Sequence, residues 1–407
     1  MRTRRKLLTA AAALTVVPLA LAGCSGSGAG GSSGGDPKTI TILDYYNNEP
    51  DKGLVQELLD QCAADLGLTI ERESVPGKDL IQKVLQRASS KTLPDVLMLD
   101  NPDVQEIAAS GALAPLSDFD VDTSGYIDGI IEAATYEGEV YGLAPAVNTL
   151  GLFYNVDILE AAGIEPPTTW AELKEAAAAL TVGDQYGMAF SAIATYEGTW
   201  QFLPFMWTNG GEETDLQTPE NAEALQLWVD LVNDGSASQS VINWSQGDVK
   251  DQFAAGKAAM MINGPWNIPA LNETDVNWAT VQVPVNEEGQ TPVAPLGGEV
   301  WTVPQTGDAE KQANAAEFVQ CMGSDEIALQ AAETRFTVPT RADVIPEFTE
   351  KVPTMAAFAE QVVNARSRTG QLGEEWPTQA TVIYNAIQLA LTGKATPDEA
   401  FEQAAEG

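Results

Sequence analysis

The chain has 407 residues, 44% of them hydrophobic, which is enough for about two domains with buried cores. Its 58 acidic residues outnumber 21 basic ones, and the formal net charge of −37 repels the phosphates of nucleic acids and anionic lipids, so we expect neither as a partner. The sequence contains no histidine, which excludes Ser-His-Asp and Cys-His catalysis and His-ligated zinc.

Residues 1–23 have the pattern of a lipoprotein signal peptide. Four basic residues within 2–6 precede an apolar run that begins at Leu7 and ends in Leu21-Ala22-Gly23-Cys24. Cleavage would make Cys24 a lipid-modified N-terminus and anchor the protein at the extracellular face of a bacterial cell membrane. It would leave 17 of the 21 basic residues against 58 acidic ones, a net charge near −41. The paired arginines also fit twin-arginine export, and the sequence leaves open whether that route or the general secretory route is used.

Residues 24–35 are a Gly/Ser tether that is too polar to bury a core. Within it, residues 26–31 match the glycine spacing of a dinucleotide-binding loop, but no strand precedes them. Residues 118–122 open like a calcium loop, yet Thr123 and Gly129 stand where that loop needs glycine and glutamate. We therefore expect no cofactor and no metal site.

Strand and helix patterns alternate after the tether. Strands are predicted over 39–43, 68–75 and 96–99, and helices over 54–65, 79–88 and 104–109. This order predicts a mostly parallel sheet with helices on both faces. Ligands of such sheets bind beyond the carboxyl ends of the strands, where the loops 44–49 and 100–101 mix aromatic rings with amides and carboxylates.

Two cysteines remain once Cys24 carries a lipid. Cys62 and Cys321 are too few for a zinc site made of cysteines alone. In an oxidising exterior they either form a disulfide or lie buried as small apolar groups, and the sequence does not choose between these alternatives.

An ordered set of phrases resembles one protein family. The phrases are Pro94-Asp95-Val96, ASGALAPL at 109–116, YGLAP at 141–145, LFYNVD at 152–157, AGIEPPTTWAEL at 162–173, FAAGKAAM at 253–260, NGPW at 263–266 and Gly297-Gly298. In order and spacing they are similar to the extracellular solute-binding proteins of the maltodextrin-binding type, the capture subunits of carbohydrate ABC importers. Val156 departs from the lysine that is usual there.

The resemblance implies a type II periplasmic-binding-protein-like α/β fold, in which crossing hinge strands join two lobes around a ligand cleft. The matched phrases assign 36–146 and 293–340 to the first lobe, and 147–292 and 341–407 to the second. Asn148 would lie at a crossing, where the hinge absorbs the rotation that closes the cleft.

The resemblance also implies a protein that is not an enzyme. It would bind a mono- or oligosaccharide and deliver it to the permease of an ABC transporter, as a monomer that meets the membrane only through its lipid. Two alternatives stay open. One is the same fold with a non-sugar solute, such as a peptide, a polyamine or a phosphorylated compound. The other is a secreted glycoside hydrolase that works with two carboxylates.

Sugar recognition needs aromatic rings for the C–H faces of the sugar and planar polar groups for its hydroxyls. The aromatic candidates are Tyr45, Tyr46, Trp200, Trp266, Trp301 and Trp376. The polar candidates are Asn48, Glu49, Asp100, Asn148, Asn263, Glu299 and Arg335. Glu299 is the foremost carboxylate, because the two glycines before it let a ligand approach the backbone closely.

Overall fold

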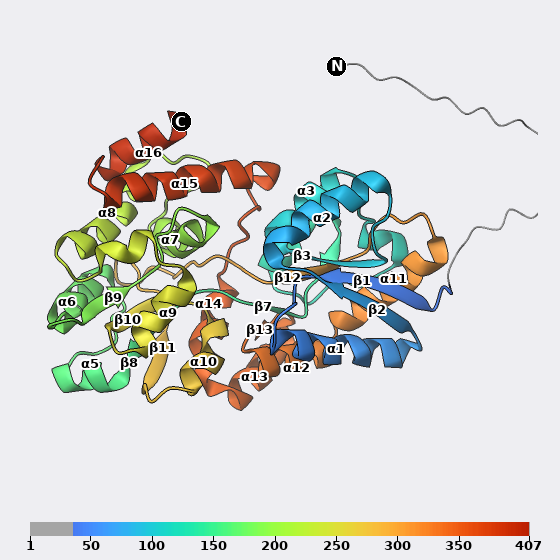
Figure 1. Cartoon of the computed structure of the whole chain (residues 1–407), viewed down its shortest axis with the longest axis horizontal. Helices are drawn as coiled ribbons and strands as arrows, with labels where there is room; N and C mark the ends of the chain where they lie inside the picture. Colours follow the sequence, from blue (N-terminus) through green and yellow to red (C-terminus); the bar gives the residue numbers. More distant parts are fainter. Residues whose placement is uncertain (1–35, 407) are drawn as a thin grey trace, which may run out of the picture. The chain divides into compact units, whose positions relative to one another are not determined.

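The computed structural model describes residues 36–406, shown in Figure 1. The predicted signal peptide, the tether and Cys24, the predicted lipidation site, lie outside these residues. Among the described helices, none is both long and apolar enough to cross a membrane.

Within the described chain, the first lobe is built on a five-stranded sheet in the order β2-β1-β3-β12-β6. The strands are β1 (Thr39–Asp44), β2 (Thr69–Ser74), β3 (Val96–Asp100), β6 (Gly142–Leu143) and β12 (Glu299–Thr302). The pairs β1-β2 and β1-β3 are parallel, as predicted, whereas β12 is antiparallel to both of its neighbours. The sheet is mixed because β12 enters from the opposite direction, after the chain has passed through the second lobe.

Helices cover both faces of this sheet, as the alternating pattern predicts. They are α1 (Asp51–Leu66), α2 (Gly77–Ser90), α3 (Val104–Ala109), α4 (Asp128–Ala133), α11 (Ala309–Met322) and α12 (Asp325–Arg335). Helix α13 (Ile345–Lys351), which the matched phrases assign to the second lobe, packs against α12. Helix α1 packs against α11 and α12, while α2 and α3 lie on the other side of the strands in Figure 1. A disulfide joins Cys62 of α1 to Cys321 of α11, with 5.8 Å between their Cα atoms. Of the two alternatives that the sequence leaves open for these cysteines, pairing is therefore the one observed.

The second lobe is built on a four-stranded sheet of the described chain, in the order β11-β8-β10-β9. Its strands are β8 (Gly151–Asn155), β9 (Tyr186–Ala189), β10 (Ala258–Asn263) and β11 (Trp278–Val281). Successive side chains of a strand face opposite sides. Leu152 and Ile262 therefore join one buried cluster, whereas Phe153 and Met261 join another.

The helices of the second lobe are α5 (Val156–Ala162), α6 (Trp170–Leu180), α7 (Tyr196–Thr208), α8 (Pro219–Asn233), α9 (Gln246–Ala254), α10 (Ile268–Asn272), α14 (Ala356–Val363), α15 (Trp376–Leu391) and α16 (Pro397–Glu406). Helices α7, α8, α15 and α16 pack on one another (Figure 1). Thr169 and Glu172 form a capping box at the start of α6, which satisfies backbone N–H groups at that end.

Three short backbone pairings connect the lobes. Strand β7 (Ala146–Val147) pairs with β13 (Val338–Pro339). Beyond β7, the backbones of Asn148 and Gly297 exchange hydrogen bonds of 3.2 and 2.8 Å. The third pairing places Arg366 beside residues 294–296. These pairings hold the crossing segments side by side, while the exact lobe boundaries stay a prediction.

Candidate ligand-binding site

A cavity of about 340 Å³ lies where the crossing segments meet side chains from both lobes. It is lined by Tyr45, Asp100, Asn148, Tyr196, Glu197, Trp200, Gln246, Trp266, Gly297, Gly298, Glu299 and Arg368. We call the side chains from the five-stranded half, namely Tyr45, Asp100 and Glu299, the first-lobe wall. The second-lobe wall comprises Tyr196, Glu197, Trp200, Gln246 and Trp266.

Hydrogen bonding organises the first-lobe wall. Tyr45 follows β1, Asp100 ends β3 and Glu299 begins β12, so the sheet order brings the three together. The Tyr45 hydroxyl donates to Oε1 of Glu299. Burial raises the pKa of the Tyr45 phenol well above its usual range, and the charge of Glu299 raises it further. Tyr45 therefore remains a proton donor at neutral pH.

Aromatic rings and amides form the second-lobe wall. Trp266 is 39% exposed and Tyr196 is 51% exposed, whereas Trp200 is only 7% exposed. The carboxylate of Glu197, near the start of α7, accepts the backbone N–H of Gln246, the first residue of α9, at 2.9 Å. This bond ties the two helix starts together beside the cavity.

Arg368, between α14 and α15, links the two walls. Its Nη2 donates to Asp100 at 3.1 Å, and its guanidinium carbon lies 4.6 Å from the centre of the Trp200 ring. Its Nε is buried and has no hydrogen-bond partner within the described residues. Nearby, burial raises the pKa of Asp103 to about 7, the charge of Asp100 adds to the rise, and Arg368 opposes it.

Residues 57–359 match the model of the bacterial extracellular solute-binding protein family. The chain belongs to this family. A maltooligosaccharide ABC transporter solute-binding lipoprotein of Streptococcus pneumoniae serotype 4 is 24% identical, over 97% of this chain and 96% of the relative. The galactooligosaccharide-binding protein of Bacillus subtilis is 22% identical, over 96% of this chain and 93% of its own.

Solved structures give the same fold. The cyclic alpha-maltosyl-1,6-maltose binding protein from Arthrobacter globiformis superposes with a TM-score of 0.80 and 25% identity, covering 90% of this chain and 97% of that one. The architecture of this solute-binding protein is therefore the two-lobe type II fold that the resemblance implies.

Six of the candidates for ligand contact line the cavity of this solute-binding protein. They are Tyr45, Asp100, Asn148, Trp200, Trp266 and Glu299. They come from segments more than 250 residues apart in the chain, and the crossing of the two lobes brings them together.

Three of the remaining candidates are buried in structural roles, which corrects their placement. Trp301 is 2% exposed in the middle of the first sheet, opposite Met98 and Leu143. Trp376 is 4% exposed and begins α15, where it packs into the second-lobe core. Asn263 is fully buried. Its side-chain nitrogen donates to the Gln246 carbonyl at 2.9 Å, and its side-chain oxygen accepts the Gly264 N–H at 3.0 Å.

Four other candidates also lie outside the cavity lining. Arg335 donates to Asp51 at 3.0 Å and stacks on the Tyr46 ring at 4.4 Å, so both support the wall without facing the cavity. Glu49 is exposed and accepts the N–H of Gly53 at 3.0 Å in the first turn of α1. The exposed Asn48 donates to its neighbour Asn47.

The interpretation of the sequence missed Tyr196, Glu197, Gln246 and Arg368, which line the cavity. The first three lie at the starts of α7 and α9, where the sequence carries a helix pattern and no separate signal of a ligand contact. A signal for Arg368 was present, because two arginines at 366 and 368 stand out in a chain with so few basic residues.

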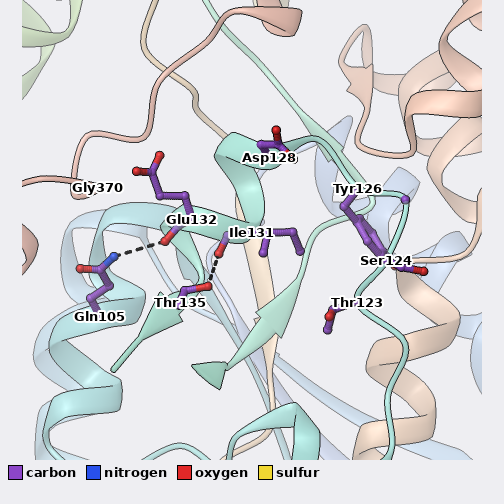
Figure 2. Close-up of a pocket in the computed structure, with 10 residues that line it drawn as sticks. Gln105, Thr123, Ser124, Tyr126, Asp128, Ile131, Glu132, Thr135 and Gly370 are labelled. Carbon is purple, nitrogen blue, oxygen red and sulfur yellow. Dashed lines mark hydrogen bonds between the residues drawn. The ribbon is translucent and has the colours of Figure 1, made fainter. Parts of the chain in front are cut away.

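A second cavity of about 560 Å³, shown in Figure 2, is lined by Gln105, Thr123, Ser124, Gly125, Tyr126, Asp128, Ile131, Glu132, Thr135 and Gly370. Its one ring belongs to Tyr126, whose hydroxyl already donates to the Gly323 carbonyl at 2.7 Å. The Gln105 amide is likewise used, since it donates to the carbonyl of Glu132. The smaller cavity is the candidate binding site, because there aromatic rings and polar groups of both lobes converge.

Proposed function

We propose that this solute-binding protein captures a short, uncharged saccharide between its lobes and delivers it to the permease of an ABC transporter. The observation that carries this proposal is the pairing of the exposed Trp266 ring with the carboxylates of Glu299 and Asp100 across one cavity. The C–H face of a sugar ring packs on an aromatic ring, and its hydroxyls donate to carboxylates.

The relatives support a saccharide as ligand. Those compared here are named for binding maltooligosaccharides, galactooligosaccharides and a cyclic maltosyl-maltose. The volume of about 340 Å³ is at the lower end of the range of roughly 300–1,000 Å³ for ligand cavities, so it favours a ligand of about one or two rings.

The charge of the lining supports an uncharged ligand. Asp100, Glu197 and Glu299 are acidic, and the positive charge of Arg368 is already paired with Asp100 at 3.1 Å. A phosphorylated compound would face net repulsion in such a cavity. The exposed rings give a sugar more contact area than a polyamine could use, which makes the polyamine the weaker alternative.

We further infer that the ligand leaves unchanged. A glycoside hydrolase needs a protonated carboxyl group beside the leaving oxygen. Asp103 has a raised pKa, but it does not line the cavity. The hydrolase alternative therefore gains no acid from this group.

The proposed cellular arrangement follows from the N-terminal sequence. Cleavage after residue 23 would leave Cys24 lipidated, with 24–35 as a tether and the two lobes outside the membrane as a monomer. The family of extracellular solute-binding proteins is consistent with this location.

Thermal-shift measurements on the purified protein test the function. We expect maltose, maltotriose, lactose or a related neutral sugar to raise the melting temperature, because a ligand that binds only the folded state adds about 2.7 kcal/mol at 100 times its dissociation constant. Glucose 6-phosphate and spermidine should have no effect. A shift by either of these without a shift by any sugar would overturn the proposal, as would recovery of a cleaved sugar.

A further inference from the structure

The Trp266 ring folds back over Gly264. A Cβ atom on Gly264 would lie 2.0 Å from Cζ3 and Cη2 of Trp266, and 2.4 Å from Cε3. Real Cβ atoms do not approach other heavy atoms within 3.0 Å. The ring can therefore occupy this position only because residue 264 has no side chain.

The backbone of Gly264 would accept an alanine. Its φ of −102° and ψ of 168° are ordinary extended values, so the steric cost of a methyl group falls on the ring and not on the backbone. The conformation is also fixed from both sides. The buried Asn263 accepts the Gly264 N–H at 3.0 Å, and the buried Asn267 donates to the Gly264 carbonyl at 3.0 Å.

Gly297 repeats this arrangement at the crossing segment. A Cβ atom there would lie 2.1 Å from Oδ1 of Asn148 and 2.8 Å from Cη2 of Trp200. Gly297 lies outside the positive-φ region, in contrast to Gly298 with its φ of 120°. The missing side chain of Gly297 is thus the space in which an amide and a ring of the cavity lining meet.

We propose that Gly264 and Gly297 are positioning residues of the binding site. Each provides the space for a lining tryptophan, Gly264 for Trp266 and Gly297 for Trp200, and so sets the angle of that ring to the ligand. The placement of the two rings does not depend on the proposed function, whereas the expected effect on sugar affinity rests on that function.

Fluorine NMR of the full chain labelled with 5-fluorotryptophan tests the ring placement without a ligand. The variants Trp266→Phe and Trp200→Phe assign the two resonances. We expect Gly264→Ala to shift the Trp266 line and Gly297→Ala to shift the Trp200 line. Gly247→Ala is the matched control, because a Cβ there meets only Ser245 Oγ, at 3.6 Å. An unmoved line in either glycine variant overturns the assignment for that ring.

Calorimetric titration with maltotriose as probe tests the consequence. Gly264→Ala should weaken binding about tenfold, and Gly247→Ala should stay within about twofold of the native protein. In a Trp266→Ala background, Gly264→Ala should have no further effect, because the ring that it displaces is gone. Additive losses would overturn the proposal. If the native protein ignores maltotriose and other sugars, the proposed function fails while the NMR result still decides the ring placement.

A double variant covers the case in which Gly264→Ala does not fold. If the clash with Trp266 is the cause, the double variant Gly264→Ala with Trp266→Ala should regain the native circular dichroism spectrum. A double variant that remains unfolded would show that Gly264 is needed for the backbone itself, and the positioning role would be lost.

Discussion

Hydrogen bonds and ion pairs hold the side chains of the first-lobe wall of the cavity, whereas packing holds the two tryptophans of the second-lobe wall. Tyr45 bonds Glu299, and beneath them Arg335 is paired with a carboxylate of α1. On the other side, Trp266 rests on a glycine and Trp200 is covered by a guanidinium group. Directional bonds fix polar atoms and favour selectivity, while rings supply contact area and favour affinity.

The interiors of the lobes differ in a similar way. A disulfide joins α1 and α11 in the first lobe. In the second lobe, Phe190, Phe202 and Phe205 surround Trp228, with ring centres 4.3, 5.2 and 5.8 Å from it. The first lobe thus has a covalent link between two of its helices, whereas the second lobe has a cluster of packed aromatic rings.

Removing the disulfide should have the largest effect on stability, and it should destabilise the first lobe more than the second. Replacing Cys62 and Cys321 by serine opens a link between residues 259 positions apart, which we expect to cost about 3–5 kcal/mol of unfolding free energy. Hydrogen exchange should show faster exchange in α1 and α11 than in α7 and α8. Equal acceleration in both lobes would mean that the lobes unfold as one unit.

Trp266→Ala should have the largest effect on binding. Because the ring is 39% exposed, its loss should leave folding intact while costing about 2–3 kcal/mol of affinity for the best sugar. Val182→Ala, at a site that is 68% exposed on the same lobe, serves as a control with native affinity. Isothermal titration calorimetry measures both, and native affinity in Trp266→Ala would remove this ring from the site.

Glu299→Gln tests the opposite wall with a smaller change. The amide keeps an acceptor for the Tyr45 hydroxyl but loses the charge that strengthens hydrogen bonds from sugar hydroxyls. We expect a loss of about 1–2 kcal/mol in affinity, measured by the same titration. The exposed Glu288→Gln is the matched control. A loss of affinity larger than that of Trp266→Ala would contradict the idea that the rings supply most of the affinity.

Asp103→Asn should have the smallest effect and concerns stability. The pKa of Asp103 is about 7 in the folded protein against an ordinary 3.8, so the group stabilises the fold below about pH 4 and this contribution is lost as the pH rises through 7. The asparagine variant should lack this decline, so its unfolding free energy relative to that of the native protein should be higher at pH 8 than at pH 5. Urea unfolding at both pH values measures it. The exposed Asp184→Asn should retain the native pH dependence.

Local patterns were sufficient for the first half of the first lobe. The elements from β1 to α3 were predicted to within a few residues, because each has its own apolar periodicity. The position of β12 between β3 and β6 was not predictable, since no local pattern says which strands a distant segment will join.

Most of the cavity-lining residues that the sequence predicts follow strands or lie in familiar phrases. Tyr45, Asp100 and Glu299 were found in this way. Arg368 was not, because its partner Asp100 lies 268 positions away and its role arises from tertiary contact. Trp376 was predicted to contact the ligand but begins a helix, and the proline that follows it is typical of a helix start.

The central place of β12 in the first sheet also bears on how the chain is made. Synthesis proceeds from the N-terminus, and β12 ends only at Thr302, after the last strand of the second sheet has ended at Val281. Of the two sheets, the one that begins first is therefore completed last. Until then an uncovered edge of β3 can pair with foreign strands, so a nascent chain of this protein needs protection from aggregation well beyond its midpoint.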